Sequence, residues 1–395
     1  MKRSEYLWHY ADRAHRRQPV TYDLRGSNGP SDTCLKVPFR FDPLWTKDSL
    51  HGVVVLGGSP AAREKVGLAY GMQPEDIVLI AGGGSLANHH VLHVLADHQD
   101  TILVERPGYE ALHASAKATG AKVVDLPRTP QNGFQVDLQQ LKALLEEHHP
   151  RVVLLTNLHN PSSFAVRNLS EIVQLIEAFN NSSSSSNESG HHEQKRRTIL
   201  MIDEIYREMA VSGDIPCAAT LGRDVVCTTS TTKTYGLSGI RMGAVLSCNK
   251  DIVEGVIAYN TVAAVANSAV LENLWLQFFE HRDTVLHDIR QLREERYAIV
   301  KQILSDGGVQ FFAPDGGNTL IAELPRNDKG QLIDDNEFVK RLIREHDTGV
   351  TQGTFFGLPG HIRIGFMDVP DTNTLKEGLR RFVQLHNDHS DSVII

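Results

Sequence analysis

The stretch TTSTTKTYGLSGIRMG, residues 228–243, decides the fold that we expect, because it places one lysine directly behind a run of hydroxyl side chains. A lysine on a helix surface is commonly only a solvated charge. Here the five Thr and Ser residues of 228–232 favour a strand or a phosphate-facing turn over a helix, and three glycines keep the following loop tight. We therefore interpret Lys233 as a functional residue able to form a Schiff base, with Ser230 and Arg241 as candidate phosphate ligands.

The composition of the chain is that of a large globular protein that binds small molecules. Of its 395 residues, 41% are hydrophobic and 22% are charged, which allows an ample core. The formal net charge is -8 and no long basic stretch is present, so nucleic acid is not an expected partner. The four cysteines are far apart in sequence and form no CxxC pair, which argues against a zinc site or a disulfide framework and indicates a reducing, cytoplasmic location. They are Cys34, Cys217, Cys227 and Cys248.

Two segments resemble membrane or targeting sequences and are interpreted otherwise. The basic start of the chain, residues 1–17, contains two acidic residues and no apolar core, so we interpret it as a surface helix or arm, with mitochondrial targeting as the alternative. The apolar stretch 256–279 is interrupted by Asn and Glu residues. A membrane span needs about 20 mostly apolar residues, so we predict one buried or interface helix there.

Residues 180–197 form a polar, Ser-rich segment that we predict to be a mobile surface loop. Its glycosylation-type triplets at Asn180, Asn181 and Asn187 are interpreted as chance matches. His191 and His192 are a possible metal pair, but we interpret them as part of a solvated insertion.

Short β-rich runs alternate with helical stretches from residue 75 onwards, which indicates an α/β domain with a largely parallel sheet. Seven runs are predicted as strands: 76–80, 101–105, 121–126, 151–157, 198–203, 224–230 and 243–248. Residues 137–149 are predicted as a helix behind an Asp137 cap. Long helices such as 283–306 follow, then a smaller mixed region. We therefore expect a large domain, 45–280, and a small domain formed by 1–44 and 281–395.

Polar and aromatic residues stand where predicted strands end, which is where open parallel sheets bind ligands. The turn Gly83-Gly84-Ser85 opens a helix and is suited to holding a phosphate. Tyr109 follows another strand end and suits stacking on a planar ring. Asp203 ends an apolar strand, and a buried carboxylate needs a positive partner. Taken singly, each of these features also has an ordinary structural explanation.

Three further residues complete the set of candidates. Asn160 precedes a proline, which favours an extended backbone and an amide directed into the crevice. Tyr206 follows Asp203 after two residues. Arg363 lies in the predicted strand HIRIGF and is a forked donor suited to a carboxylate. Each of these signals is weak to moderate by itself, but their order and spacing agree with one family.

Together these motifs resemble the class I/II aminotransferases, the fold-type I enzymes dependent on pyridoxal 5'-phosphate (PLP). The resemblance rests on Asp-x-x-Tyr, Ser-x-x-Lys and an arginine eight residues after the lysine, and covers roughly residues 70–370. It implies a mostly parallel seven-stranded sheet with a smaller α+β domain, and a homodimer. It also implies that Lys233 forms the Schiff base and shuttles a proton, and that Asp203 pairs with the pyridine nitrogen.

The resemblance assigns the remaining candidates to the cofactor and the substrate. Tyr206 and Asn160 would hydrogen-bond the phenolic oxygen of the ring, Tyr109 would stack on it, and Arg363 would bind the substrate α-carboxylate. The phosphate cup would consist of Gly83, Gly84, Ser85, Ser230 and Arg241.

Two departures from the family pattern favour a specialised biosynthetic enzyme. The region 51–63 lacks the tyrosine that commonly reaches the cofactor phosphate of the partner subunit, and the usual Asn-Pro-x-Gly motif reads Asn-Pro-Ser-Ser at 160–163. We expect an aminotransferase acting on an α-amino acid and a 2-oxo acid. The alternatives are PLP-dependent elimination, replacement or cyclisation, and a non-catalytic regulatory protein with the same fold.

Overall fold

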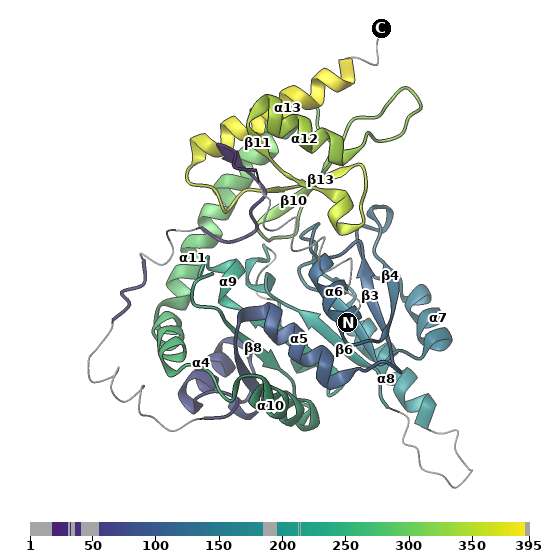
Figure 1. The fold of residues 1–395 in the computed structure, drawn as a ribbon, viewed down its shortest axis with the longest axis vertical. Helices are drawn as coiled ribbons and strands as arrows, with labels where there is room; N and C mark the ends of the chain where they lie inside the picture. The colour runs from purple at the N-terminus through teal and green to yellow at the C-terminus, as the bar shows by residue number, and fades with distance from the viewer. Residues whose placement is uncertain are drawn as a thin grey trace.

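A seven-stranded sheet forms the centre of the larger part of the molecule (Figure 1). The chain is described by a computed structural model for residues 18–30, 32, 36–40, 55–184, 196–211, 213 and 215–391. The strand order is β2-β8-β7-β6-β5-β3-β4, and β8 runs antiparallel to both of its neighbours while the other neighbouring pairs are parallel. The strands are β2 (Ile77–Ala81), β3 (Thr101–Arg106), β4 (Lys122–Pro127), β5 (Val152–Thr156), β6 (Ile199–Asp203), β7 (Val225–Ser230) and β8 (Met242–Leu246). All seven predicted strands, and the mostly parallel sheet, are confirmed.

Both faces of this sheet are buried, because successive strand residues belong to different core clusters. Leu103 packs into one cluster, whereas Ile102 and Val104 pack into the other. The first cluster is covered by α4 (Pro60–Tyr70), α7 (Leu138–His148), α8 (Leu169–Ser184) and α11 (Ala269–Asp306). The second is covered by α5 (Gly83–Leu95), α6 (Glu110–Ala118) and α10 (Lys250–Ala264). The result is a three-layer α/β arrangement typical of parallel sheets.

A four-stranded antiparallel sheet forms the centre of the smaller part, drawn at the top of Figure 1. Its strands are β9 (Phe311–Phe312), β10 (Thr319–Glu323), β12 (Thr351–Gln352) and β13 (His361–Gly365), accompanied by α12 (Asp335–His346) and α13 (Thr372–Asp391). Near the N-terminus, β1 (Tyr22–Asp23) pairs in parallel with β11 (Thr348–Gly349). Residues far apart in sequence therefore build this part together.

Short helical turns complete the described elements. The four-residue helix α9 (Thr231–Thr234) follows β7, so the hydroxyl-rich run begins as a strand and ends as a helix. The 3-10 turns are η1 (Pro74–Asp76), η2 (Pro130–Asn132), η3 (Arg207–Met209), η4 (Ala218–Leu221) and η5 (Gly353–Phe356).

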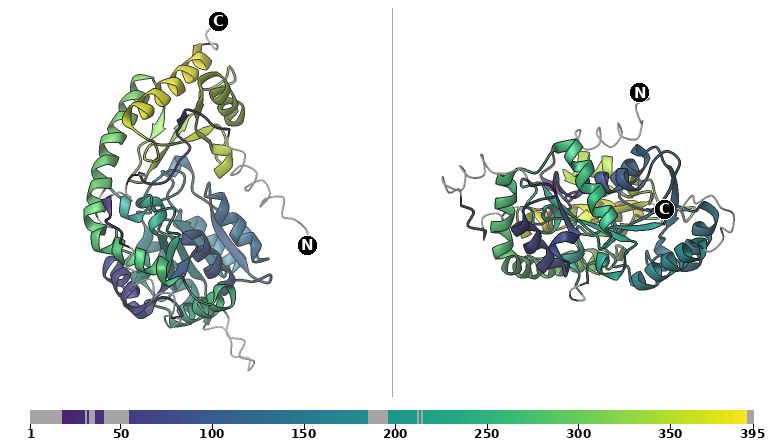
Figure 2. Two further views of the ribbon diagram at one scale, coloured as in Figure 1. Left: turned by 60° about the vertical axis from the view of Figure 1, so that its left-hand side comes forward. Right: turned by 90° about the horizontal axis from the view of Figure 1, so that it is seen from below.

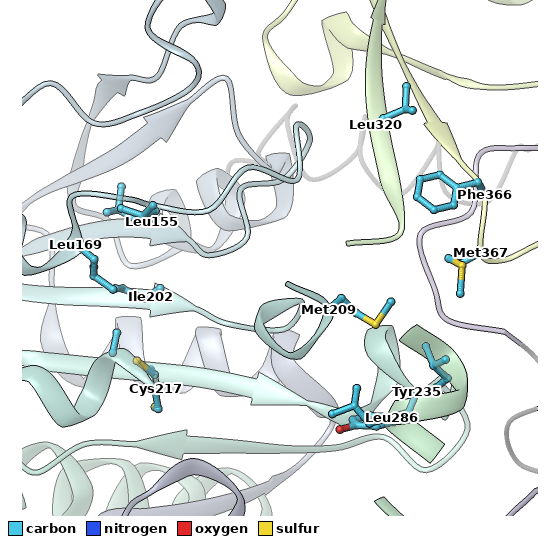
Figure 3. Close-up of a cluster of buried hydrophobic side chains, with 14 of the residues drawn as sticks. Leu155, Leu169, Ile202, Met209, Cys217, Tyr235, Leu286, Leu320, Phe366 and Met367 are labelled. Carbon is cyan, nitrogen blue, oxygen red and sulfur yellow. The ribbon is translucent and has the colours of Figure 1, made fainter. Parts of the chain in front are cut away.

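The long helix α11 connects the two parts along one side of the molecule (Figure 2, left). It packs against α4 of the larger part and α13 of the smaller part. One apolar cluster also spans both parts, since it contains Leu155 and Ile202 of the large sheet together with Leu320 and Phe366 near the small sheet (Figure 3). The two sheets are thus held by a shared core.

The single helix predicted for 256–279 is wrong. Helix α10 ends at Ala264, Val265 has a φ of 64°, and α11 begins at Ala269. Asn267 explains the break, because its amide bonds the edge strand: Oδ1 accepts from Ala81 N at 2.8 Å and Nδ2 donates to Leu79 O at 2.9 Å. A continuous helix would forfeit both of these bonds.

The Ser-rich loop begins later than predicted, because α8 continues to Ser184. Asn180 is buried, donates to Thr198 O at 2.9 Å and accepts from Thr198 N at 2.8 Å. Asn180 therefore ties the helix to the start of β6 instead of lying in the loop. Residues 185–195 of the predicted loop, which include Asn187 and the His191-His192 pair, lie outside the described residues, as do residues 1–17.

Two cysteines that are apart in sequence meet in the core. The sulfur atoms of Cys217 and Cys227 lie within 4.8 Å of each other and of a Glu204 carboxylate oxygen. Burial raises the pKa of the Cys227 thiol well above its usual value, and Arg207 pairs with Glu204 at 3.4 Å. Sequence separation alone was therefore a poor guide to the distance between these thiols.

Across the described helices, none combines the length and apolar character needed to span a membrane.

Candidate active site

A cavity of about 720 Å³ lies between the carboxyl ends of the parallel strands and the smaller sheet. Most of the residues singled out from the sequence line it: Gly84, Ser85, Tyr109, Asn160, Asp203, Tyr206, Lys233, Arg241 and Arg363. Gly83 and Ser230 do not line the cavity but lie next to Arg241, which does. A Cβ on Gly83 would stand 3.4 Å from Arg241 Nη2 and 3.6 Å from Ser230 Oγ. The structure thus brings together side chains that are up to 280 positions apart in the sequence.

Lys233 projects from the short helix α9 into this cavity. Its Nζ donates to Asn28 Oδ1 at 2.8 Å and to Ser27 Oγ at 3.3 Å. Its carbonyl oxygen accepts from Gly29 N at 2.5 Å and Asn318 Nδ2 at 2.9 Å. Both ends of the lysine are therefore fixed by segments outside the large sheet.

Asp203 is the last residue of β6, and its carboxylate is oriented from two sides. Oδ2 accepts from Asn88 Nδ2 at 2.8 Å, and Oδ1 accepts from Ile205 N at 3.1 Å. Thr228 in turn donates to Asn88 Oδ1, which fixes the amide so that its NH₂ group faces Asp203. Burial raises the pKa of Asp203, although the Asn88 hydrogen bond opposes this. A cation placed against the carboxylate would relieve the cost of burying its charge.

The N-terminus of α5 forms a cradle suited to an anion. Gly82 and Gly83 have φ values of 135° and 76°, which only glycine adopts readily, and they direct the first helix N–H groups towards the cavity. Arg241 Nη2 donates to Gly82 O at 2.8 Å, so its guanidinium lies beside the cradle. Ser230 Oγ donates to Met242 O at 2.9 Å and accepts from Thr232 N at 3.2 Å. The hydroxyl of Ser230 therefore also supports the turn that carries the lysine.

Arg363 lies at the opposite side of the cavity and is 6% exposed. Its Nη1 donates to Asn160 Oδ1 at 3.0 Å, and its Nη2 donates to Arg25 O at 3.3 Å. The guanidinium carbon stands 4.7 Å from the centre of the Phe356 ring. These contacts hold the forked donor in place with its charge directed at the cavity, as a carboxylate ligand would require.

The cavity fits a planar ring that carries a phosphate and a basic nitrogen. The helix cradle and Arg241 supply the phosphate contacts, and Tyr109 supplies an aromatic surface at the start of α6. Asp203 is the anion that such a nitrogen would pair with when protonated. Tyr206 differs from the expectation in one respect, because its hydroxyl donates to Ser27 O at 3.1 Å.

The N-terminal segment Ser27–Pro30, here called the strap, also contacts the site, and no sequence motif indicates it. It crosses directly over α9: Asn28 bonds Lys233 Nζ, and Gly29 lies so close to Thr234 O that a Cβ would overlap it. Asn88, which orients Asp203, was also missed. No motif spacing connects residues 28 and 233. Asn88, in contrast, stands one helical turn after the predicted Gly-rich cradle, and this spacing could have indicated that it faces the site.

Comparison with known proteins identifies the family. The family model for "Aminotransferase class I and II" matches residues 46–382. Capreomycidine synthase of Streptomyces vinaceus is 26% identical over 83% of this chain and 76% of its own length. Tyrosine aminotransferase of Dictyostelium discoideum is 24% identical over 79% of this chain and 74% of its own length.

Solved structures share the fold. A PLP-dependent aminotransferase from Streptococcus suis has a TM-score of 0.83 at 22% identity, covering 98% of this chain and 99% of its own. Aspartate aminotransferase from Thermus thermophilus with maleate has a TM-score of 0.76 at 16% identity, covering 98% and 97%. The fold expected from the sequence, fold type I, is thereby confirmed. The chain belongs to the class I and II aminotransferases, and it is a PLP-dependent transferase.

Proposed function

We propose that the cavity transfers the amino group of an α-amino acid to a 2-oxo acid, with Lys233 as the residue that binds PLP covalently. The observation that carries the proposal is the convergence of Lys233, Asp203 and Arg363 on one cavity. When bound, PLP supplies an electron sink that stabilises negative charge at the substrate Cα. The task of the protein is to hold the reactants and to move a proton.

The residues divide this task by position. Arg363, held by Asn160, binds the substrate α-carboxylate and so fixes the Cα relative to the ring. Lys233 Nζ would act as the base that takes the proton from the substrate Cα and as the acid that later donates it. Asp203 would keep the ring nitrogen protonated, and the α5 cradle with Ser85, Ser230 and Arg241 would anchor the phosphate. Asn160 would contact the phenolic oxygen, Tyr206 would do so by exchanging its hydrogen bond to Ser27 O for one to the ring, and Tyr109 would stack on the ring.

The test is covalent trapping at the lysine. Borohydride treatment of the holoenzyme should leave a reduced cofactor adduct on the peptide that contains Lys233, found by mass spectrometry. The Lys233→Ala variant should lose this adduct and all multiple-turnover activity. Lys340 also lines the cavity, so Lys340→Ala is a matched control that should keep the adduct. Multiple turnover by Lys233→Ala would rule out the assignment.

A second candidate reaction is elimination, replacement or cyclisation of an amino acid on the same cofactor. It is favoured by one relative, 26% identical, whose name is that of a synthase and not of a transaminase. Formation of a 2-oxo acid together with the amino form of the cofactor would support transamination. Release of ammonia, or a cyclic product without an amino acceptor, would support the second candidate. Either outcome is compatible with a role in specialised biosynthesis, which we also propose.

We propose that the active form is a homodimer. Support comes from apolar side chains on the surface of the described chain, since Val262 is 91% exposed, Leu68 77% and Val265 59%. Exposed apolar patches commonly mark association surfaces. Light scattering should give twice the chain mass, and a fully active monomer would contradict the proposal.

We also propose a large domain of residues 45–280 and a small domain of 1–44 and 281–395. The support is that the strands of the smaller sheet lie between 311 and 365 and that β1 joins β11. Hydrogen exchange should resolve two cooperative units with this boundary. Exchange as one unit would contradict it.

A cytoplasmic location is proposed from the thiols. Cys217, Cys227 and Cys248 are free in the described chain, as is usual in reducing compartments. Microscopy of the tagged full chain tests the location, and an organellar signal would contradict it.

A further inference from the structure

The amine of Lys233 is held by the side chain of a residue that lies 205 positions earlier in the chain. Asn28 Oδ1 accepts from Lys233 Nζ at 2.8 Å, and Ser27 Oγ accepts from the same atom at 3.3 Å. An amide oxygen can only accept a hydrogen bond, whereas an ammonium group can only donate. A neutral amine could donate the same bond, but the bond from a charged ammonium group is stronger, so the contact favours the protonated form of the lysine.

The orientation of the Asn28 amide is fixed by a second residue. Asn28 Nδ2 donates to Asp368 Oδ2 at 2.8 Å. A carboxylate oxygen accepts from the NH₂ group but not from the amide oxygen, so this bond turns the oxygen of Asn28 towards Lys233. If the amide were flipped, Asn28 Oδ1 would face the Asp368 carboxylate, which is also an acceptor, and Asn28 Nδ2 would face the Lys233 ammonium group, which is also a donor.

The strap has little room to move away from the lysine. A Cβ on Gly26 would stand 2.6 Å from the Cβ of Asp368. Gly29 of the strap packs against the backbone of α9, and Gly236 packs against the backbone of the strap. Leu24, just before the strap, bonds both Gly349 O at 2.8 Å and Gly365 N at 2.7 Å. The backbone thus holds Asn28 between the small sheet and the catalytic helix.

Strand β13 contains Arg363, the proposed substrate anchor, and the chain after this strand leads to Asp368, which holds the Asn28 amide. Arg363 lies within β13, and Asp368 follows this strand after Gly365. A shift of β13 on substrate binding would therefore be passed through Asp368 and Asn28 to the lysine amine. This connection is built from two side-chain hydrogen bonds.

We propose that Asn28 positions the amine of Lys233 and stabilises its protonated form, with Asp368 fixing the orientation of the Asn28 amide. The inference rests on the proposed role of Lys233. Asn28 acts on the proton that the lysine carries, and it does not contact the substrate α-carboxylate, which Arg363 binds. The two functions can therefore be separated kinetically.

The direct test measures the lysine in cofactor-free protein. Acetic anhydride labelling of the Lys233 peptide, followed by mass spectrometry across pH, gives the midpoint at which the amine becomes reactive. In Asn28→Asp, the new carboxyl group faces both Nζ and the Asp368 carboxylate and would share a proton with the latter, so the midpoint should rise by less than about 1 pH unit. In Asn28→Ala, loss of the acceptor should lower it by roughly half a unit, and Asp368→Asn should lower it by less than that.

Kinetics of the holoenzyme provide the second readout. Asn28→Ala should lower kcat about tenfold with KM nearly unchanged, because the lost contact acts on the proton-transferring group. Asn132→Ala, an exposed asparagine of the large part, is the matched control and should change neither kcat nor the labelling midpoint. Melting temperatures of all variants identify any that fail to fold.

The outcomes separate this inference from the proposed function. Identical labelling midpoints in wild type, Asn28→Ala and Asn28→Asp would overturn the positioning role, whatever the activities are. If the midpoints shift as expected but borohydride traps no cofactor on Lys233 in the wild type, the positioning contact stands and the proposed function fails.

Discussion

Lys233, the proposed catalytic lysine, lies between two walls of the cavity that differ in origin. One wall consists of the strand ends of the large sheet, with Asp203 at the end of β6, Ser230 at the end of β7 and the α5 cradle after β2. The other is the strap Ser27–Pro30, which has no regular secondary structure of its own. The first wall presents groups suited to a cofactor. The second contacts the lysine itself, through Asn28 and Gly29.

If the proposed roles hold, one wall positions the cofactor and the other controls the proton on Lys233. Parallel strands end at the same edge of a sheet, so the strand-end wall is a rigid consequence of topology. Leu24, just before the strap, bonds β11 and β13, so the strap is expected to follow any displacement of these two strands of the smaller part. The cofactor side is thus expected to stay fixed while the lysine side responds to substrate.

The largest effect is expected from the strand-end wall, in Asp203→Asn. The amide has nearly the same shape but lacks the charge that would keep the ring nitrogen protonated, so kcat/KM should fall about 10²–10³-fold. Steady-state kinetics at saturating cofactor measure the loss. Asn88→Ala, which removes the orienting hydrogen bond at 2.8 Å but leaves the charge, should cost much less. Equal losses of kcat/KM in the two variants would mean that the orientation of the Asp203 side chain matters and its negative charge does not.

A smaller effect is expected from displacing the strap, in Gly29→Ala. The new Cβ would overlap Thr234 O, so the strap must shift, at a cost of about 1–3 kcal/mol, and Asn28 should lose its contact with Lys233. We expect a lower melting temperature and a roughly tenfold lower kcat, with KM little changed.

Gly239→Ala is the matched control for this substitution. Gly239 lies in the loop after the lysine, and nothing stands within 4 Å of a Cβ placed there. The control should keep both stability and kcat. If Gly29→Ala behaves in the same way, the strap is looser than its contacts indicate, and the contrast between the two walls is weakened.

The same contrast explains what the sequence could predict. Asp203, Lys233 and Arg241 follow apolar β-rich runs, and their spacing reflects local chain geometry, so both the fold and most of the cavity could be predicted. Asn28 meets Lys233 through contacts between segments that are distant in sequence, such as the two-residue pairing of β1 with β11 across more than 300 positions and the bond of Asn28 to Asp368. Such a contact leaves no periodicity or spacing in the sequence.

The break between α10 and α11 was missed for a related reason. Residues 256–279 are apolar enough for one helix, but the side chain of Asn267 bonds the backbone of β2. The gain from these tertiary hydrogen bonds overrides local helix propensity. Only the position of the neighbouring strand reveals that this asparagine ends a helix.

The smallest effect is expected at the altered Asn-Pro-Ser-Ser turn of the strand-end wall, in Ser163→Gly. Ser163 has a φ of 61°, a left-handed conformation that costs a residue with a side chain about 1 kcal/mol and glycine almost nothing. The serine hydroxyl bonds Thr319 Oγ1 at 3.2 Å, and this neutral hydrogen bond contributes about 1 kcal/mol. Glycine would remove the strain and the bond together, so the free energy of unfolding should change by less than about 1 kcal/mol, as measured by urea denaturation. Thr319→Val removes the bond but keeps the strain, and it should therefore destabilise the protein more than Ser163→Gly does. The reverse order would show that this turn is held by its hydrogen bond and not limited by its backbone.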